Sequence, residues 1–248
     1  MDTPCLVLEE VTKNFGGLTA VDHVSLEVMP GERRGIIGPN GAGKTTLFNL
    51  ICGDLPVSHG KIVHLGRDVT RIPPYKRTAL GIARTFQITN LFPNLTVLHN
   101  LLLAAQGLEK TKYIMYSPIS SYKHLYKKSK ELGEEVGLWE KRDVLIKNLS
   151  HGEQRQIEAC LALIGQPGLL LLDEPTAGLS PAETLSFTKM LKKINPDVTI
   201  LLIEHDMDVA FELAENIAVL HQGSLIATGT KEEIKANTTV QEIYLGME

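Results

Sequence analysis

The chain has 248 residues, of which 43% are hydrophobic and 22% are charged, an ordinary composition for a soluble globular protein. This length allows one large domain, or a core with a smaller subdomain inserted into it. The formal net charge of -4 argues against a dedicated nucleic-acid surface, so no nucleic-acid partner is expected. The three cysteines are widely spaced, which excludes a paired metal-ligand motif and favours reduced thiols in a cytoplasmic compartment.

No segment of the sequence is long and apolar enough to span a membrane. The longest apolar runs, Leu169–Leu172 and Ile200–Ile203, have the length of a strand, whereas a spanning helix needs roughly 20 residues. The first residues, Met1–Pro4, lack the basic and then apolar layout of a signal peptide. We therefore expect a soluble chain, which would act at a membrane only by docking on a membrane-embedded partner.

The first part of the chain alternates between strand and helix patterns. Apolar and polar residues alternate over Val24–Val28, a turn follows at Pro30-Gly31, and Arg34–Gly38 leads into a glycine-rich loop. A helix is predicted from Thr45 to Gly53. Further strands are expected at Lys61–Leu65, Ile82–Phe86, Leu169–Leu172 and Val198–Ile203, and a hairpin is expected at Ile217–Leu220 and Leu225–Thr228.

The pattern between Ile88 and Gln166 is helical. Asn94 is expected to cap a helix that carries apolar residues at helical spacing, and a second helix is predicted near Glu131–Leu138. A lysine-rich stretch, Lys110–Lys130, separates them and is interpreted as a solvated helix face. The first helix would carry Leu98, Leu101, Leu102 and Ala105.

Eight consecutive residues match the phosphate-binding pattern G-x-x-x-x-G-K-[ST], between a predicted strand and a predicted helix. The glycines let backbone N–H groups close around phosphates, and the helix N-terminus adds partial positive charge. Lys44 is expected to reach the β- and γ-phosphates and the Thr45 hydroxyl to hold Mg²⁺. The sequence therefore predicts nucleoside triphosphate binding by Gly38, Pro39, Asn40, Gly41, Ala42, Gly43, Lys44 and Thr45, together with the adjoining Thr46.

Two acidic residues, Asp173 and Glu174, end the apolar strand Leu169–Leu172. A carboxylate at the C-terminal end of a strand beside a P-loop lies where a P-loop ATPase needs its second magnesium ligand, so this role is assigned to Asp173. Glu174 points differently and can polarise the attacking water as a general base. The alternative is that both acids only cap the strand end or bind nearby backbone amides.

The segment Leu149–Gln154 opens a helix with a capping box formed by Ser150 and Glu153. By itself this pattern indicates only a well-capped helix. Ahead of the two acids, however, it resembles the signature motif Leu-Ser-Gly-Gly-Gln of ABC ATPases, with His151 for the first glycine and Glu153 for the glutamine. The resemblance implies that Ser150 and Gly152 face the γ-phosphate of ATP bound to the opposite subunit, and a helix N-terminus suits an anion.

Four further positions follow the order of ABC ATPase motifs along almost the whole chain. The resemblance implies that Phe15 stacks on adenine, that Gln87 touches Mg²⁺ and the lytic water, and that His205 senses the γ-phosphate. Ser180 stands where the family commonly has an aspartate, in a loop that crosses between subunits. The stretch Ser180–Glu183 also predicts a second capping box, with proline at N1. By residue type alone, Phe15 also fits a core position, Gln87 a structural hinge and His205 a structural histidine.

The fold class implied by this resemblance is α/β. It consists of a P-loop NTPase core, that of an ABC ATPase, with an N-terminal antiparallel β subdomain and an inserted helical subdomain. We expect a single domain over residues 1–248, with the nucleotide-binding core formed by residues 1–87 and 167–248 and the helical subdomain by residues 88–166. The implied cofactors are ATP and Mg²⁺.

Among ABC proteins, the sequence favours a transporter motor over two soluble classes. DNA-repair ATPases of this family carry long heptad arms, and translation ATPases join two nucleotide-binding domains in one chain. This sequence has neither heptad arms nor a second P-loop. A small-molecule kinase shares only the P-loop and does not explain Ser150–Gln154 or His205.

Four stretches resemble the LivG-type ATP-binding subunits of branched-chain amino-acid importers: Phe15–Val21, Ala83–Gln87, Glu204–Met207 and Tyr244–Gly246. Urea and amide importers carry closely similar subunits, and the lipopolysaccharide-export ATPase is a more distant relative. The implied partners are transmembrane permease subunits and a second ATP-binding subunit, in a paralogous heterodimer or a homodimer. An extracellular substrate-binding protein would select the substrate without contacting this chain, which would be cytoplasmic and peripheral on the inner face of the cell membrane.

Overall fold

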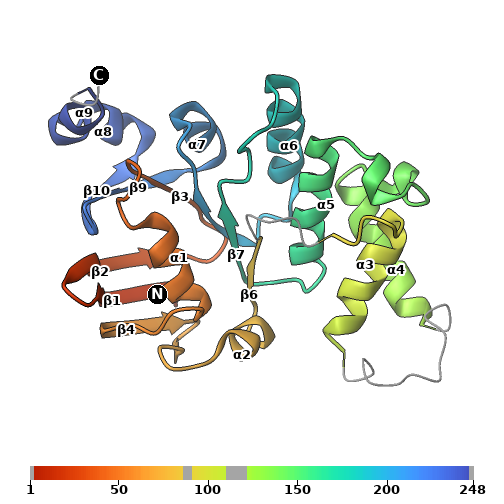
Figure 1. The fold of residues 1–248 in the computed structure, drawn as a ribbon, viewed down its shortest axis with the longest axis horizontal. Helices are drawn as coiled ribbons and strands as arrows, with labels where there is room; N and C mark the ends of the chain where they lie inside the picture. Colours follow the sequence, from red (N-terminus) through yellow and green to blue (C-terminus); the bar gives the residue numbers. More distant parts are fainter. Residues whose placement is uncertain (1–2, 86–90, 110–121, 246–248) are drawn as a thin grey trace. The chain divides into compact units, whose positions relative to one another are not determined.

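The computed structural model describes residues 3–85, 91–109 and 122–245, which divide into two compact units (Figure 1). Unit 1 comprises Met1–Arg84, Gly168–Pro175 and Pro196–Glu248, and unit 2 comprises Thr85–Pro167 and Thr176–Asn195. The range predicted for the helical subdomain, residues 88–166, lies within the first segment of unit 2, and unit 2 also includes a second stretch of chain. The functional division of the chain stays a prediction. No helix in the described ranges is long and apolar enough to cross a bilayer.

Unit 1 contains a four-stranded antiparallel sheet built from the N-terminal part of the chain. Every second residue of Val24–Val28 is buried and the residues between are exposed, as the alternating pattern predicts. This sheet confirms the expected antiparallel β subdomain. Its strands, in sheet order, are β2 (Leu18–Val28), β1 (Leu6–Phe15), β4 (His59–His64) and β5 (Arg67–Asp68).

A second, six-stranded sheet of unit 1 carries the P-loop strand. The strands β7 and β8 are buried at every position, which explains why their sequences are continuous apolar runs. All neighbouring strands are parallel except for the edge pair formed by β9 and β10. The sheet order is β10 (Ser224–Thr230), β9 (Asn216–His221), β3 (Arg33–Ile37), β8 (Thr199–Ile203), β7 (Leu169–Asp173) and β6 (Ile82–Arg84).

The predicted hairpin is confirmed, because Gln222 and Gly223 between β9 and β10 have φ of +47° and +85°, as a type I′ turn requires. The strand expected over Ile82–Phe86 is described only as far as Arg84, and Phe86 lies outside the described residues.

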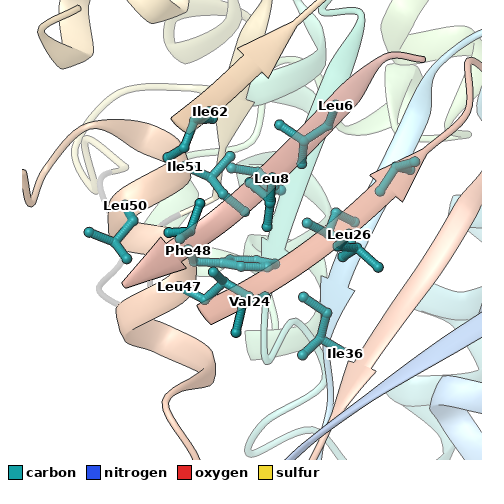
Figure 2. Close-up of a cluster of buried hydrophobic side chains, with 14 of the residues drawn as sticks. Leu6, Leu8, Val24, Leu26, Ile36, Leu47, Phe48, Leu50, Ile51 and Ile62 are labelled. Carbon is teal, nitrogen blue, oxygen red and sulfur yellow. The ribbon is translucent and has the colours of Figure 1, made fainter. Parts of the chain in front are cut away.

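Helix α1 (Lys44–Cys52) packs its apolar face into the core of unit 1. Leu47, Phe48 and Ile51 are fully buried, and Figure 2 shows these side chains among residues of β1, β2 and β4. Burial of one such side chain contributes about 1.5–3 kcal/mol. The helix that begins at the P-loop is therefore firmly anchored in the same core as both sheets.

The other helices of unit 1 are short, and sequence periodicity did not reveal them. Three of them begin with a recognisable signal: proline at N1 for α2, the Asp206 carboxylate for α7, and a capping box of Thr230 and Glu233 for α8. These helices are α2 (Pro74–Ala79), α7 (Met207–Leu213), α8 (Lys231–Ala236) and α9 (Thr238–Leu245).

The described residues of unit 2 are mainly helical, as expected. The capping boxes predicted at Ser150 and Ser180 are both present, and Pro181 occupies N1 of the second helix. The helices are α3 (Val97–Gly107), α4 (Lys123–Glu135), η3 (Trp139–Lys141), η4 (Ile146–Asn148), α5 (His151–Leu163) and α6 (Pro181–Lys193).

Two predicted boundaries in unit 2 were wrong. The cap of α3 is Thr96 rather than Asn94, because the Thr96 hydroxyl accepts the backbone N–H of His99 at 3.2 Å. The helix expected near Glu131–Leu138 begins earlier, at Lys123, and is over before Gly137, whose φ of +79° suits a helix end.

Candidate functional site

The predicted phosphate-binding loop lies between β3 and α1 in unit 1. Gly43 is the N-cap of α1 with φ of +98°, and no side chain caps the first N–H groups of the helix. These donors are therefore available to an anion. A Cβ atom on Gly43 would lie 2.3 Å from the Ala20 carbonyl oxygen, and one on Gly38 would lie 2.2 Å from the Leu220 carbonyl oxygen. The loop thus passes too close to neighbouring backbone for larger residues at either position.

The Lys44 side chain folds back over this loop. Its ammonium nitrogen donates to the carbonyl oxygens of Gly38 at 2.6 Å and Pro39 at 3.0 Å. Burial lowers the pKa of Lys44, while the negative charges of Glu174 and Asp173 oppose that shift. The lysine is therefore a buried cation held inside the loop that is expected to surround phosphates.

Asp173 ends β7 with a side chain that is completely buried. Its Oδ2 accepts a hydrogen bond from Nη2 of Arg84 at 2.8 Å, whereas its Oδ1 is buried without a hydrogen-bond partner among the described residues. Burial raises the pKa of Asp173, and the Arg84 hydrogen bond opposes this. A buried carboxylate oxygen without a donor fits coordination of a hard cation such as Mg²⁺.

Glu174, the next residue, differs from Asp173 in exposure and backbone conformation. Its φ is +47°, a left-handed value that is uncommon for a residue with a side chain and that is found at strained functional positions. Its N–H donates to the Ile203 carbonyl at 3.0 Å, and its Oε1 lies 3.6 Å from Nδ1 of His205. The side chains of Glu174 and His205 are 27% and 54% exposed, so both are open to water.

The predicted signature residues lie at the start of α5 in unit 2. The Ser150 hydroxyl accepts the Glu153 N–H at 3.3 Å, and the Glu153 carboxylate accepts the Ser150 N–H at 2.9 Å. Lys141 forms an ion pair with the Glu153 carboxylate. Glu153, which stands where the motif usually has glutamine, is therefore held by contacts within unit 2.

A carboxylate already binds the N–H of the signature glycine. Glu183 Oε1 accepts the Gly152 N–H at 2.9 Å, and its Oε2 accepts the N–H and hydroxyl of Ser180 at 3.1 and 2.8 Å. These hydrogen bonds, that from Gly152 first, lower the pKa of Glu183 to about 2. The start of α5 therefore accommodates an anion, as helix N-termini commonly do.

The family follows from comparison of the whole chain with known proteins. Residues 21–177 match the family model described as ABC transporter. The chain belongs to the ABC transporter family. It is an ATPase subunit of the family, and its structure has the fold of ABC ATPase cassettes, which confirms the predicted fold class.

Curated members of this family align with nearly the whole length of this ABC ATPase. A branched-chain amino acid transport ATP-binding protein, LivG of Salmonella typhimurium, is 37% identical over 99% of both chains. BraF of Pseudomonas aeruginosa, with the same description, is 36% identical over 99% of both chains. The lipopolysaccharide export ATP-binding protein LptB of Haemophilus influenzae is 34% identical over 97% of both.

Solved structures agree with these relatives. A nucleotide-free ATP-binding cassette from an ABC transporter is 32% identical, with a TM-score of 0.84 over 97% of this chain and 98% of that one. A cassette in its ADP conformation is also 32% identical, with a TM-score of 0.86 over 98% of this chain and 99% of that one.

The structure of this ABC ATPase separates the predicted site residues into two groups. Unit 1 holds the P-loop, Asp173, Glu174 and His205, and unit 2 holds the signature residues. Phe15 ends β1 and is 45% exposed, with the Lys13 ammonium 5.0 Å from its ring centroid, so it is not a core residue. Gln87 lies outside the described residues.

Sequence reasoning missed two residues that contact this site. Arg84, which binds Asp173, gave no local signal beyond its place before Gln87 in a stretch that resembles importer subunits. Glu183 was recognised only as a helix-capping residue, and its bond to Gly152 joins segments that are distant in sequence.

Proposed function

We propose that this ABC ATPase is the motor subunit of an importer for branched-chain amino acids. The observation that carries this proposal is the identity of 36–37% with LivG and BraF proteins over 99% of each chain. The alternative is that the chain drives an exporter, which its 34% identity to LptB would favour. Uptake of labelled leucine by cells that lack this chain tests the substrate class. Loss of leucine uptake is expected, and unchanged leucine uptake would contradict it.

The proposed ATP site uses residues of unit 1. Lys44 would leave its two loop carbonyls to bind the β- and γ-phosphates, which are better partners for a cation than neutral oxygens. Thr45 and Asp173 would hold Mg²⁺, with Gln87 as a third contact. When bound, the ion neutralises charge on the phosphates. Phe15 would stack on adenine, and the phosphate cradle is formed by Gly38, Pro39, Asn40, Gly41, Ala42, Gly43, Lys44, Thr45 and Thr46.

Glu174 is the proposed general base. Its carboxylate is partly exposed, so a water molecule can reach it, and its neighbour Asp173 is buried and bonded to Arg84. Glu174 would accept the proton of the attacking water while His205, 3.6 Å away, contacts the γ-phosphate. The two adjacent acids would therefore perform different tasks because one is buried and the other is accessible.

The complete site would be formed by two ATPase subunits. Ser150 and Gly152 of one subunit would bind the γ-phosphate held by the P-loop of the other. The hydrogen bond from Gly152 to a carboxylate at 2.9 Å supports this, because it demonstrates that the N–H can bind an anion. Phosphate would then replace the Glu183 carboxylate. The second subunit would be a paralogous ATPase, as a heterodimer, or a second copy of this chain.

Analytical ultracentrifugation tests the two-subunit site. The Glu174→Gln chain, in which ATP should persist, is examined with Mg-ATP, alone and mixed with the paralogous subunit. An ATP-dependent increase in mass for one of these samples is expected. Full ATP turnover by the unsubstituted chain as a monomer would contradict the proposal.

Membrane permease subunits are the proposed coupling partners, with the chain peripheral on the cytoplasmic face. Unit 2 offers Phe92, which is 57% exposed in the segment Leu91–Pro93. A charge at this position, Phe92→Glu, should abolish assembly with the permease and amino-acid uptake while leaving ATP binding intact. Persistent uptake would place the docking surface elsewhere. The extracellular substrate-binding protein of such a system would not contact this chain, and the chain would bind no nucleic acid.

A further inference from the structure

Arg84 links the proposed metal ligand to the helix that follows the P-loop. It is the last residue of β6, which pairs in parallel with β7, and its side chain is only 11% exposed. Its Nη2 donates to Asp173 Oδ2 at 2.8 Å, and its Nη1 donates to Asn49 Oδ1 at 2.6 Å and Asp54 Oδ2 at 3.2 Å. One guanidinium therefore connects the end of β7 with α1 and the turn after it.

These bonds distinguish the two oxygens of the Asp173 carboxylate. Oδ2 is occupied by Arg84, and Oδ1 is buried without a donor among the residues that the structure describes. A carboxylate free to rotate about its Cβ–Cγ bond would present either oxygen to a cation. With Oδ2 held at 2.8 Å, Oδ1 is the oxygen left for coordination.

The hydrogen bond from Arg84 to Asn49 anchors the guanidinium on α1. Asn49 belongs to the same nine-residue helix whose first two residues are Lys44 and Thr45. Arg84 thus fixes the position of Asp173 relative to the helix that carries Thr45, the other proposed magnesium ligand. All of these residues belong to unit 1.

We propose that Arg84 is a positioning residue for the proposed magnesium site. Arg84 orients the Asp173 carboxylate relative to α1 and leaves Oδ1 as the oxygen that would bind the ion. This inference rests on the proposed role of Asp173 as a metal ligand. Outer residues that orient metal ligands commonly change metal affinity by about ten- to hundredfold when they are removed. Arginine suits the task because its planar fork reaches several acceptors at once, which a lysine ammonium on a flexible stem does not reproduce.

A purely structural role is the competing explanation, since a buried ion pair also affects folding. The two explanations differ in what they predict for Asp54. This residue pairs with Arg84 at 3.2 Å and is 41% exposed, so Asp54→Asn removes part of the anchor while leaving the bond from Arg84 to Asp173. It is the matched control for Arg84→Gln.

Calorimetric titration of the full chain with ATP, in Mg²⁺ and in EDTA, tests the proposal. The readout is the gain in ATP affinity that Mg²⁺ provides, together with a melting curve of each nucleotide-free variant. Arg84→Gln is expected to lose about tenfold or more of that gain, with its affinity in EDTA within about twofold of the parent. Arg84→Lys should lose most of the gain, and Asp54→Asn should keep it.

The outcomes separate this inference from the proposed metal site. If Asp173→Asn keeps the full gain from Mg²⁺, the metal role of Asp173 is wrong. If Asp173→Asn loses the gain but Arg84→Gln and Arg84→Lys keep it, the positioning role of Arg84 is wrong and the metal site stands. Loss of cooperative melting in both Arg84 variants would assign Arg84 to folding and would equally overturn the proposal.

Discussion

Replacement of Gly43 by alanine should damage the P-loop more than the same replacement at Gly41. Both glycines have left-handed backbones, with φ of +98° and +78°, so each substitution incurs about 1–2 kcal/mol of backbone strain. At Gly43 the added Cβ would also lie 2.3 Å from the Ala20 carbonyl oxygen, whereas ordinary contact begins at 3.4 Å. The Cα of Gly223, at 3.5 Å, limits movement in another direction.

Relief of this clash requires a backbone shift of about 1 Å, for which overpacking costs of about 1–3 kcal/mol are typical. Gly43→Ala should therefore lower the free energy of unfolding by about 2–5 kcal/mol, the sum of strain and clash. A Cβ on Gly41 has no neighbour within 4 Å, so Gly41→Ala should lower it by strain alone, about 1–2 kcal/mol. Denaturant unfolding of both variants measures the difference. Equal losses would refute the argument that close backbone approach requires glycine at Gly43.

Three further predictions concern stability and charge. Phe48→Ala, which empties a fully buried site beneath the P-loop helix, should cost about 3–5 kcal/mol in denaturant unfolding, and a loss below 1 kcal/mol would contradict the packing. Burial lowers the pKa of His64, and this effect outweighs the opposite effect of its hydrogen bonds to the carbonyl oxygens of Cys5 and Leu80. Because the unfolded chain takes up the proton at a higher pH than the folded chain, the free energy of unfolding should fall as the pH drops below about 6.5. The fall should be smaller in His64→Gln. The Glu183 carboxyl should titrate near its pKa of about 2 by NMR, and Ser180→Ala should raise that pKa, whereas an ordinary value for the parent chain would contradict the hydrogen bonds of Glu183.

The sequence predicted those features that depend on neighbouring residues. The P-loop, the apolar strands β7 and β8, and the caps at Ser150 and Ser180 are each complete within a short stretch, so pattern and spacing were sufficient. The strand ending at Asp173 was found for the same reason.

The errors and omissions arise where longer-range contacts decide. Asn94 and Thr96 are both plausible caps, and the choice between them depends on where the chain enters α3. The lysine-rich start of α4 has little apolar periodicity, although Lys127 and Lys130 pair with glutamates one turn ahead. The bonds of Arg84 to Asp173 and of Glu183 to Gly152 span 89 and 31 residues, so only the folded chain reveals them.

The most direct test of the account is ATP turnover by Glu174→Gln. The substitution keeps the size of the side chain and removes its capacity to accept a proton, so ATP affinity should stay within about twofold while phosphate release falls by about 10²–10⁴-fold, the usual contribution of a general base. Glu27→Gln, on an exposed position of β2, is the control and should turn over ATP normally. Turnover by Glu174→Gln at the parental rate would contradict the assignment of the base and with it the proposed mechanism.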